Sequence, residues 1–154
     1  MSKMAGSPGA DRPEKLSLTL ESNPVSAEVA ESLVVEFSGK AGFDERQCHE
    51  IGLAVREAVA NAVLHGNRCL IHKQVELAAE LCEGGLAVTV GDEGEGFDID
   101  AVPDPLQPGN LMLGSGRGIF LVKALMDAVS VRRSSTNGTE LTMIKYLSVK
   151  EKQQ

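Results

Sequence analysis

The chain has 154 residues, of which 42% are hydrophobic and 24% charged, and its formal net charge is -7. This length suits a single domain with a sizeable core, built mainly from aliphatic side chains because the sequence has no Trp, one Tyr and four Phe. The acidic balance disfavours direct binding of nucleic acid, which requires a basic face, but it is compatible with a protein partner or with a phosphate ligand neutralised by Mg²⁺ and backbone dipoles.

Cysteine usage and the chain ends indicate the compartment and the domain limits. The cysteines are Cys48, Cys69 and Cys82. Their odd number and irregular spacing disfavour a disulfide framework and favour a reducing, cytoplasmic compartment; with the histidines they form no paired ligand units, so zinc is disfavoured. No apolar run is long enough to predict a membrane span. Residues 1–14 predict a disordered leader without a signal peptide, and 150–154 a polar tail, which leaves 15–149 as the domain.

The first elements are a strand and a helix. Apolar and polar residues alternate over 15–20, which predicts an edge strand. Apolar residues at helical spacing predict a helix over 26–38, and Gly39 is expected to end it. The inward stripe of this helix is predicted to consist of Val29 or Ala30, Leu33, Val34 and Phe37.

A second helix is predicted from Asp44 to His65. Asp44 and Gln47 have the spacing of a capping box, and Gly66-Asn67 interrupts the helical pattern. His65 is expected to cap the helix C-terminus, although a place near a bound phosphate stays open for it. The buried stripe is predicted to consist of Ile51, Ala54, Val55, Ala58 and Ala62.

A hairpin and a long loop follow. Residues 74–81 and 86–90 predict two strands joined through Glu83-Gly84-Gly85. The segment 91–118 is rich in glycine and proline. So long a loop in a compact domain is usually functional or disordered.

The last elements are a helix over 119–128 and strands over 129–133 and 139–147, which flank the turn dipeptide Asn137-Gly138. The element order predicts an α/β (α+β) two-layer sandwich, in which helices cover one face of a mixed, largely antiparallel sheet.

The first of three candidate motifs lies on the second helix. Glu57 and Asn61 are four residues apart, so their side chains share one helix face at the margin of the apolar stripe. The Asn61 amide oxygen suits Mg²⁺, which keeps waters and takes its other ligands from phosphates. The Glu57 carboxylate could accept a proton from an attacking hydroxyl. Taken alone, the pair also fits two solvated surface side chains.

The second motif is the segment 92–97, which directly follows a predicted strand. A carboxylate such as Asp92 at a strand end can accept a hydrogen bond from the amino group of a base. Gly94 and Gly96 allow the backbone to turn sharply and to approach a flat ligand. An acidic turn without a ligand is the alternative interpretation.

The third motif is Gly114-Ser115-Gly116-Arg117-Gly118, which opens the predicted helix at Ile119. A glycine-rich segment that leads into a helix N-terminus offers unpaired N–H groups and a favourable dipole to phosphate. Arg117 could add several donors to a terminal phosphate. A flexible linker before the helix is the alternative.

In this order, the three motifs resemble the GHKL superfamily of gyrase, histidine kinases and MutL. The short length and the run from Gly118 to Asp127 are similar to its anti-sigma-factor serine kinases. The similarity covers roughly 16–147. It implies the Bergerat ATP-binding fold. Phosphate-loop, dinucleotide and protein-kinase motifs are absent from the sequence.

The resemblance also implies residue roles. Asn61 would hold Mg²⁺, Asp92 would contact the adenine amino group, and Gly94 and Gly96 would shape the base pocket. Glu57 would be the general base. The lid over the phosphates would consist of Gly114, Gly116, Arg117 and Gly118. Thr139 would make a further contact near the adenine.

The activity implied by the resemblance is that of an ATP- and Mg²⁺-dependent serine protein kinase in a bacterial partner-switching pathway. It would phosphorylate an anti-anti-sigma (STAS-type) protein and sequester a sigma factor, and so regulate transcription without contacting nucleic acid or membrane. The alternatives are a non-catalytic nucleotide-binding module that sequesters a partner, and a detached histidine-kinase-like ATPase domain. A homodimer is common among such kinases, but no residue pattern indicates one.

Overall fold

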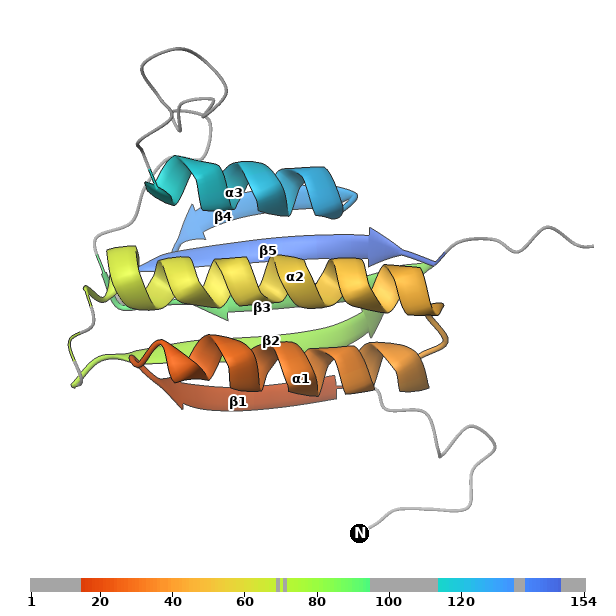
Figure 1. The fold of residues 1–154 in the computed structure, drawn as a ribbon, viewed down its shortest axis with the longest axis horizontal. Helices are drawn as coiled ribbons and strands as arrows, with labels where there is room; N and C mark the ends of the chain where they lie inside the picture. The colour runs from red at the N-terminus through yellow and green to blue at the C-terminus, as the bar shows by residue number, and fades with distance from the viewer. Residues whose placement is uncertain (1–14, 69, 71, 95–113, 135–137, 148–154) are drawn as a thin grey trace, which may run out of the picture.

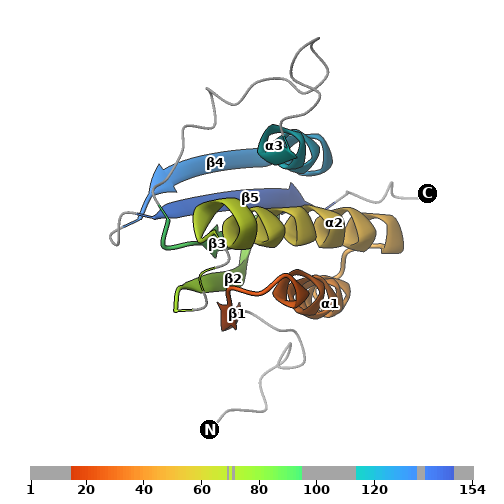
Figure 2. The same cartoon turned by 60° about the vertical axis from the view of Figure 1, so that its left-hand side comes forward.

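Three α-helices cover one face of a five-stranded sheet in the described part of the chain (Figures 1 and 2). The computed structural model describes residues 15–68, 70, 72–94, 114–134 and 138–147, and only the backbone of 114–117. The elements are β1 (Lys15–Glu21), α1 (Val25–Lys40), α2 (Glu45–Asn61), the π-helix η1 (Ala62–Gly66), β2 (Gln74–Cys82), β3 (Gly85–Gly91), α3 (Gly114–Leu125), β4 (Ala128–Arg133) and β5 (Thr139–Tyr146). The predicted two-layer sandwich is confirmed; the predicted leader and tail lie outside the described residues.

The sheet has the strand order β1-β2-β3-β5-β4, and its described pairings are all antiparallel. The first strand therefore lies at an edge, as predicted. β2 and β3 form the predicted hairpin, with Cys82 opposite Gly85 and with Gly84 in the turn at a φ of 78°. Side chains alternate between the two faces of the sheet. Every second side chain of β2 and β3 therefore points toward the helices, and Leu77 and Val88 are buried there.

Helix α1 ends later than predicted. Gly39 lies within the helix, and the residue that adopts positive φ is Gly42, at 108°. The N–H of Phe43 donates to the Ser38 carbonyl and that of Gly42 to the Gly39 carbonyl, both at 3.1 Å. This pattern is a Schellman motif, which requires the left-handed residue one position beyond the cap, so Gly42 and not Gly39 ends the helix.

Helix α2 begins as predicted, but its capping box is incomplete. The Asp44 carboxylate accepts a hydrogen bond from the Gln47 N–H at 2.8 Å. The Gln47 side chain does not return to Asp44; its Nε2 donates to the Tyr146 carbonyl at 2.9 Å. The start of α2 is therefore tied to β5, and a long-range contact replaces the local one.

The predicted loop over 91–118 is wrong at both described ends. Gly91 belongs to β3, and α3 begins at Gly114, so the third motif forms the first turns of the helix and does not precede it. The helix ends at Leu125 instead of continuing to residue 128, because the Asp127 N–H already donates to Ile144 of β5 at 2.9 Å. Residues 95–113 lie outside the described part.

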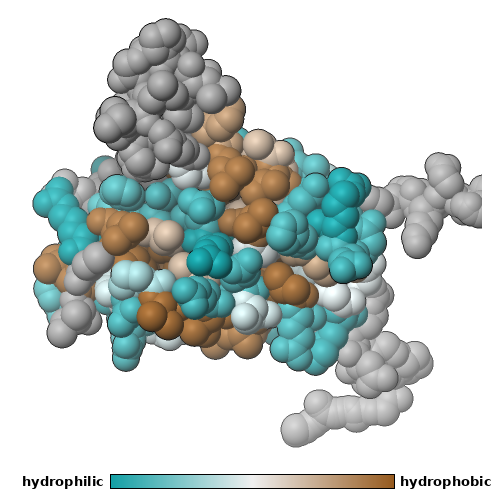
Figure 3. Space-filling view, viewed as in Figure 1, coloured by the Kyte–Doolittle hydropathy of each residue, from teal (hydrophilic) through white to brown (hydrophobic). Residues whose placement is uncertain are grey.

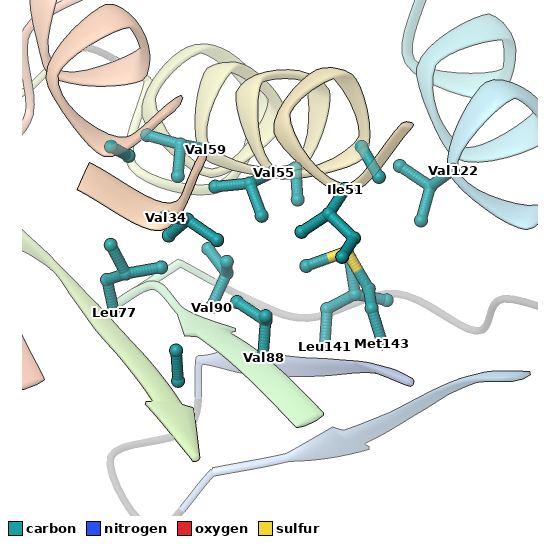
Figure 4. Packing of buried hydrophobic residues seen from close by; sticks show 14 of the residues in the cluster. Val34, Ile51, Val55, Val59, Leu77, Val88, Val90, Val122, Leu141 and Met143 are labelled. Atoms are coloured by element: carbon teal, nitrogen blue, oxygen red, sulfur yellow. The ribbon is translucent and has the colours of Figure 1, made fainter. Parts of the chain in front are cut away.

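The core lies between the helices and the sheet (Figure 4). The predicted stripe of α2 is confirmed as buried, and in α1 the inward residue is Ala30, since Val29 is 43% exposed. Full burial of one Val, Leu or Ile side chain stabilises a fold by about 1.5–3 kcal/mol. The largest fully buried aliphatic side chains include Ile51, Leu77, Leu86, Val34, Val55, Val59 and Val122. None of the described helices is long and apolar enough to cross a membrane.

Candidate functional site

Asp92 is a buried carboxylate at the end of β3, and the backbone holds it in place. Its Oδ1 accepts hydrogen bonds from the N–H of Gly94 at 2.8 Å and of Thr139 at 3.1 Å. Its own N–H donates to the Thr139 carbonyl at 2.9 Å, and the residue is 8% exposed. Oδ2 accepts no hydrogen bond from the residues that the structure describes, which leaves one fixed acceptor for a ligand.

The electrostatic environment of Asp92 favours a donor. Burial raises the pKa of this carboxyl group, and its hydrogen bonds from Gly94 and Thr139 and the charge of Lys73 only partly oppose that shift. A carboxylate that has lost solvent gains more from a further hydrogen-bond donor than an exposed one does. The site can therefore bind a ligand group that donates a hydrogen bond, such as an amino group.

Three glycines pack closely around Asp92. A Cβ atom at Gly66 would overlap the Asp92 carboxylate, and one at Gly138 would overlap the Asp92 carbonyl oxygen. A Cβ atom at Gly94 would overlap the Gly66 carbonyl oxygen. The end of η1, the turn after β3 and the start of β5 therefore meet at Asp92 at distances that only glycine permits.

Asn61 is the last residue of α2, and its amide lies in a second close contact. Its Nδ2 atom is buried and has no hydrogen-bond partner among the described residues. A Cβ atom at Gly118 of α3 would lie 2.7 Å from Nδ2 and 3.1 Å from Oδ1. Such an unpaired buried amide is rare and is expected to have a partner that is not part of the described chain.

The α-helix changes to a π-helix directly after Asn61. In η1 the Asn67 N–H donates to the Ala62 carbonyl at 2.7 Å, which is the i to i+5 pattern. Short π-helical turns inside helices occur often at functional sites. η1 brings Gly66 against Asp92 and so connects the end of α2 with the end of β3.

The structure groups the predicted site residues in two sets. Asp92, Gly94 and Thr139 are in direct contact, and Asn61 contacts Gly118. Glu57 is half-buried one turn before Asn61 on the same helix. The prediction for Gly96 falls outside the described residues, and Gly114, Gly116 and Arg117 are described by backbone alone. The ligand roles of all these residues stay predictions.

Sequence reasoning missed several residues of the site. Gly66 and Asn67 were predicted only to end a helix, and Gly138 only to form a turn. Asn67 is fully buried, and its side chain makes hydrogen bonds to three separate segments. The available signal was the position of Gly66-Asn67 directly after the first motif, but a helix end has the same composition.

A bound Mg²⁺ ion fits the chemistry of Asn61. Mg²⁺ takes few protein ligands and keeps waters and phosphate oxygens, so one amide oxygen is sufficient on the protein side. The described residues contain no group of three His, Cys, Asp or Glu side chains that could hold a metal ion. The Asn61 amide oxygen is therefore the candidate ligand, whereas its buried Nδ2, which has no partner among the described residues, is a donor suited to a phosphate oxygen.

Comparison with known proteins shows which family the chain resembles. The profile of the histidine kinase-like ATPase domain matches residues 20–145. The chain is 32% identical over 134 residues to the serine-protein kinase RsbW of Staphylococcus epidermidis, which covers 80% of this chain and 83% of that protein. It is 34% identical over 101 residues to the anti-sigma F factor of Clostridium perfringens, which covers 64% and 72%.

A solved structure shares the fold. The structure of the RsbU and RsbW domains of Rv1364c from Mycobacterium tuberculosis aligns with a TM-score of 0.65 at 22% identity, over 89% of this chain and 33% of that one. At this identity the likeness concerns the fold alone. Together with the profile match, the sequence similarity shows that the chain belongs to the histidine kinase-like ATPase (GHKL) family, in which it is similar to RsbW serine-protein kinases and anti-sigma F factors.

Proposed function

We propose that this protein is an ATP- and Mg²⁺-dependent serine kinase that phosphorylates an anti-anti-sigma (STAS-type) protein and sequesters a sigma factor. The observation that carries the proposal is the buried Asp92 carboxylate, held at Oδ1 by two N–H groups. Through Gly66 it lies against the same helix end that carries Glu57 and Asn61. The relatives named as serine-protein kinases and anti-sigma factors support the same assignment.

The nucleotide would be recognised at both ends. Asp92 accepts a hydrogen bond from the adenine amino group, and Gly94 and Gly96 leave room for the flat base. Thr139 lies beside Asp92 and contacts the nucleotide near the adenine. Gly114, Gly116, Arg117 and Gly118 cover the phosphates, and the N-terminus of α3 contributes a favourable dipole.

The residues that would carry out phosphoryl transfer lie on the last two turns of α2. Asn61 would hold a bound Mg²⁺ ion, which would supply neutralisation of the phosphate charge. Glu57 accepts the proton of the serine hydroxyl while the serine oxygen bonds to the γ-phosphorus, the bond to the bridging oxygen breaks, and ADP leaves. The product serine carries a charge near -2, which weakens its complex with this acidic chain of net charge -7.

The surface formed by the helices, on the side away from the sheet, offers apolar groups for binding a protein partner. Figure 3 shows hydrophobic patches on this face among hydrophilic residues. Large apolar side chains that are 40–59% exposed lie on α1, η1 and α3: Val25, Val29, Leu64 and Phe120. Contiguous apolar patches mark protein interaction sites, whereas single exposed apolar side chains are common on any surface, so these side chains are the candidates for partner contact where they adjoin one another.

Phosphate transfer from labelled ATP to a candidate STAS-type protein tests the proposal. The Glu57→Ala variant is expected to lose transfer by about 10²–10⁴-fold while it still binds ATP. Glu80→Ala is the matched control, because Glu80 is exposed on the sheet face away from the helices; it should transfer normally. Unchanged transfer by Glu57→Ala removes the assigned role.

The same assay separates the alternatives. Tight ATP binding without transfer to any partner indicates a non-catalytic module. An acid-labile product indicates phosphohistidine and a detached histidine-kinase-like domain, whereas phosphoserine survives acid.

A further inference from the structure

Asn67 is a fully buried polar residue with hydrogen bonds to three separate segments. Its Nδ2 donates to Ser22 Oγ at 2.8 Å and to the Gln74 carbonyl at 3.0 Å. Its Oδ1 accepts from the Glu93 N–H at 2.8 Å. The residue is 0% exposed, so removing the side chain leaves its partners without buried hydrogen bonds that the protein itself supplies.

The amide group is well matched to these partners. It supplies two donors and an acceptor from one planar group. The donors reach the end of β1 and the start of β2, which pair with each other at the sheet edge. The acceptor holds the turn that follows β3. Two strands that are themselves paired therefore anchor this turn.

The anchored turn is the one that carries Asp92. Glu93, whose N–H donates to Asn67, lies between Asp92 and Gly94, whose N–H donates to Asp92. Asn67 thus holds the turn from one side while the Asp92 carboxylate closes it from the other. The Lys73 Nζ adds a contact to the Glu93 carbonyl at 3.2 Å.

The residue before Asn67 adds a steric constraint. Gly66 packs with its backbone against Gly94 and with its Cα hydrogens toward the Asp92 carboxylate. A shift of Asn67 therefore moves Gly66 and changes the space around Asp92 Oδ2. The position of Asn67 therefore affects the Asp92 carboxylate in two ways, through the hydrogen bonds of the turn and through the packing of Gly66.

We propose that Asn67 is a positioning residue that orients Asp92 and thereby sets the selectivity of the site for a purine with a 6-amino group. The inference rests on the proposed function, because it takes Asp92 to be the group that contacts the adenine amino group. Asn67 itself touches no nucleotide in this account. Its contribution is the direction in which Oδ2 points.

The test compares the affinities for ATP and for purine riboside triphosphate, which lacks the amino group, in the presence of Mg²⁺. The wild type is expected to prefer ATP. Asn67→Ala is expected to lower this preference by about tenfold, the value of one hydrogen bond of about 1.4 kcal/mol. In an Asp92→Ala background, Asn67→Ala should not change the ratio any further, because the oriented group is already absent.

Two variants separate orientation from stability. Asn67→Asp keeps the acceptor for the Glu93 N–H and loses the donors, so it is expected to retain most of the preference at a lower melting temperature. Ser22→Ala removes one partner on the far side of Asn67 and is expected to lower stability without changing the ratio. A merely structural Asn67 would lower stability in all variants and leave every ratio at the wild-type value.

The outcomes distinguish this inference from the proposed function. If the wild type binds no adenine nucleotide, the proposed function fails, and this inference with it. If the wild type prefers ATP and Asn67→Ala has the same preference, this inference alone is overturned. If Asn67→Ala does not fold, amide exchange of Glu93 in the nucleotide-free wild type decides: slow exchange is expected, and exchange at the unstructured rate overturns the inference.

Discussion

Replacing Gly118 by Ala separates the stability of α3 from the geometry of the candidate site. Inside a helix, glycine is less favourable than alanine by about 1 kcal/mol. The added Cβ would lie 2.7 Å from Asn61 Nδ2, so the amide has to move by about 0.8 Å to reach a normal contact near 3.5 Å. Because the amide is the end of a side chain, it can move at small cost. We expect the free energy of unfolding to change by less than about 1 kcal/mol.

The same displacement should damage function. Functional groups must be held within about 0.5 Å of their productive positions, and a misplacement of about 1 Å can cost about 10²-fold in rate. Gly118→Ala is therefore expected to reduce phosphate transfer to a serine partner by about 10²-fold, while urea denaturation shows a nearly unchanged protein. Transfer at the wild-type rate would refute the idea that Asn61 requires this space.

Gly39→Ala is the matched control for this prediction. Gly39 is also a helical glycine, in α1, but it is exposed, and the nearest atom to its added Cβ is Cys48 Sγ at 4.0 Å. The substitution is expected to stabilise the fold by about 0.5–1 kcal/mol and to leave transfer unchanged. A loss of transfer in this variant would show that helix stiffness, and not the position of Asn61, limits the reaction.

Three further predictions concern stability, pH and packing. Lys145 is 9% exposed at its side chain and contacts Glu50 Oε1 at 2.7 Å and the Leu125 carbonyl at 2.6 Å. Lys145→Met removes the donor to the Leu125 carbonyl and one partner of Glu50, which keeps its ion pair with Arg46. The substitution should cost about 1–3 kcal/mol in urea denaturation, and a loss below about 0.5 kcal/mol contradicts this. Burial raises the pKa of Asp92, so as the pH falls its carboxylate is protonated at a higher pH than the ordinary pKa of about 3.9 implies. ATP affinity should therefore fall as the pH is lowered through that raised pKa. An affinity that depends on pH in the same way in Asp92→Asn argues against this. In Gly66→Ala the new methyl group overlaps the Asp92 carboxylate, and calorimetry should show ATP binding weakened by about tenfold or more; unchanged affinity rules out the close packing.

The elements of the fold were largely predictable from hydrophobic periodicity. The alternation over 15–20 and the stripe of α2 depend only on which face of each element is buried, and that information is local. Element ends were less predictable because they depend on distant contacts. Gln47 has the spacing of a capping box, yet its side chain bonds to Tyr146, 99 positions away. Gly39 and Gly42 are equally good C-terminal glycines in sequence, and backbone geometry selects the second.

Part of the candidate site could be predicted from the sequence, but Gly66, Asn67 and the contacts between the segments could not. Helical spacing is sufficient to place Glu57 and Asn61 on one face. The contact of Gly66 with Asp92 and the bond from Asn67 to Ser22, 45 positions apart, arise only when the sheet and helices are assembled. No local pattern distinguishes a buried asparagine with three partners from an exposed one that ends a helix.

The central claim is that Asp92, Asn61 and the N-terminal turns of α3 surround one adenine nucleotide. Calorimetric titration of ATP in the presence of Mg²⁺, with the wild type and with Asp92→Ala, tests it most directly. The account predicts saturable binding of one nucleotide per chain, and binding weakened by at least about tenfold in the variant although its thermal unfolding stays cooperative. Absence of heat with the folded wild type, or equal affinity in the two proteins, would contradict it.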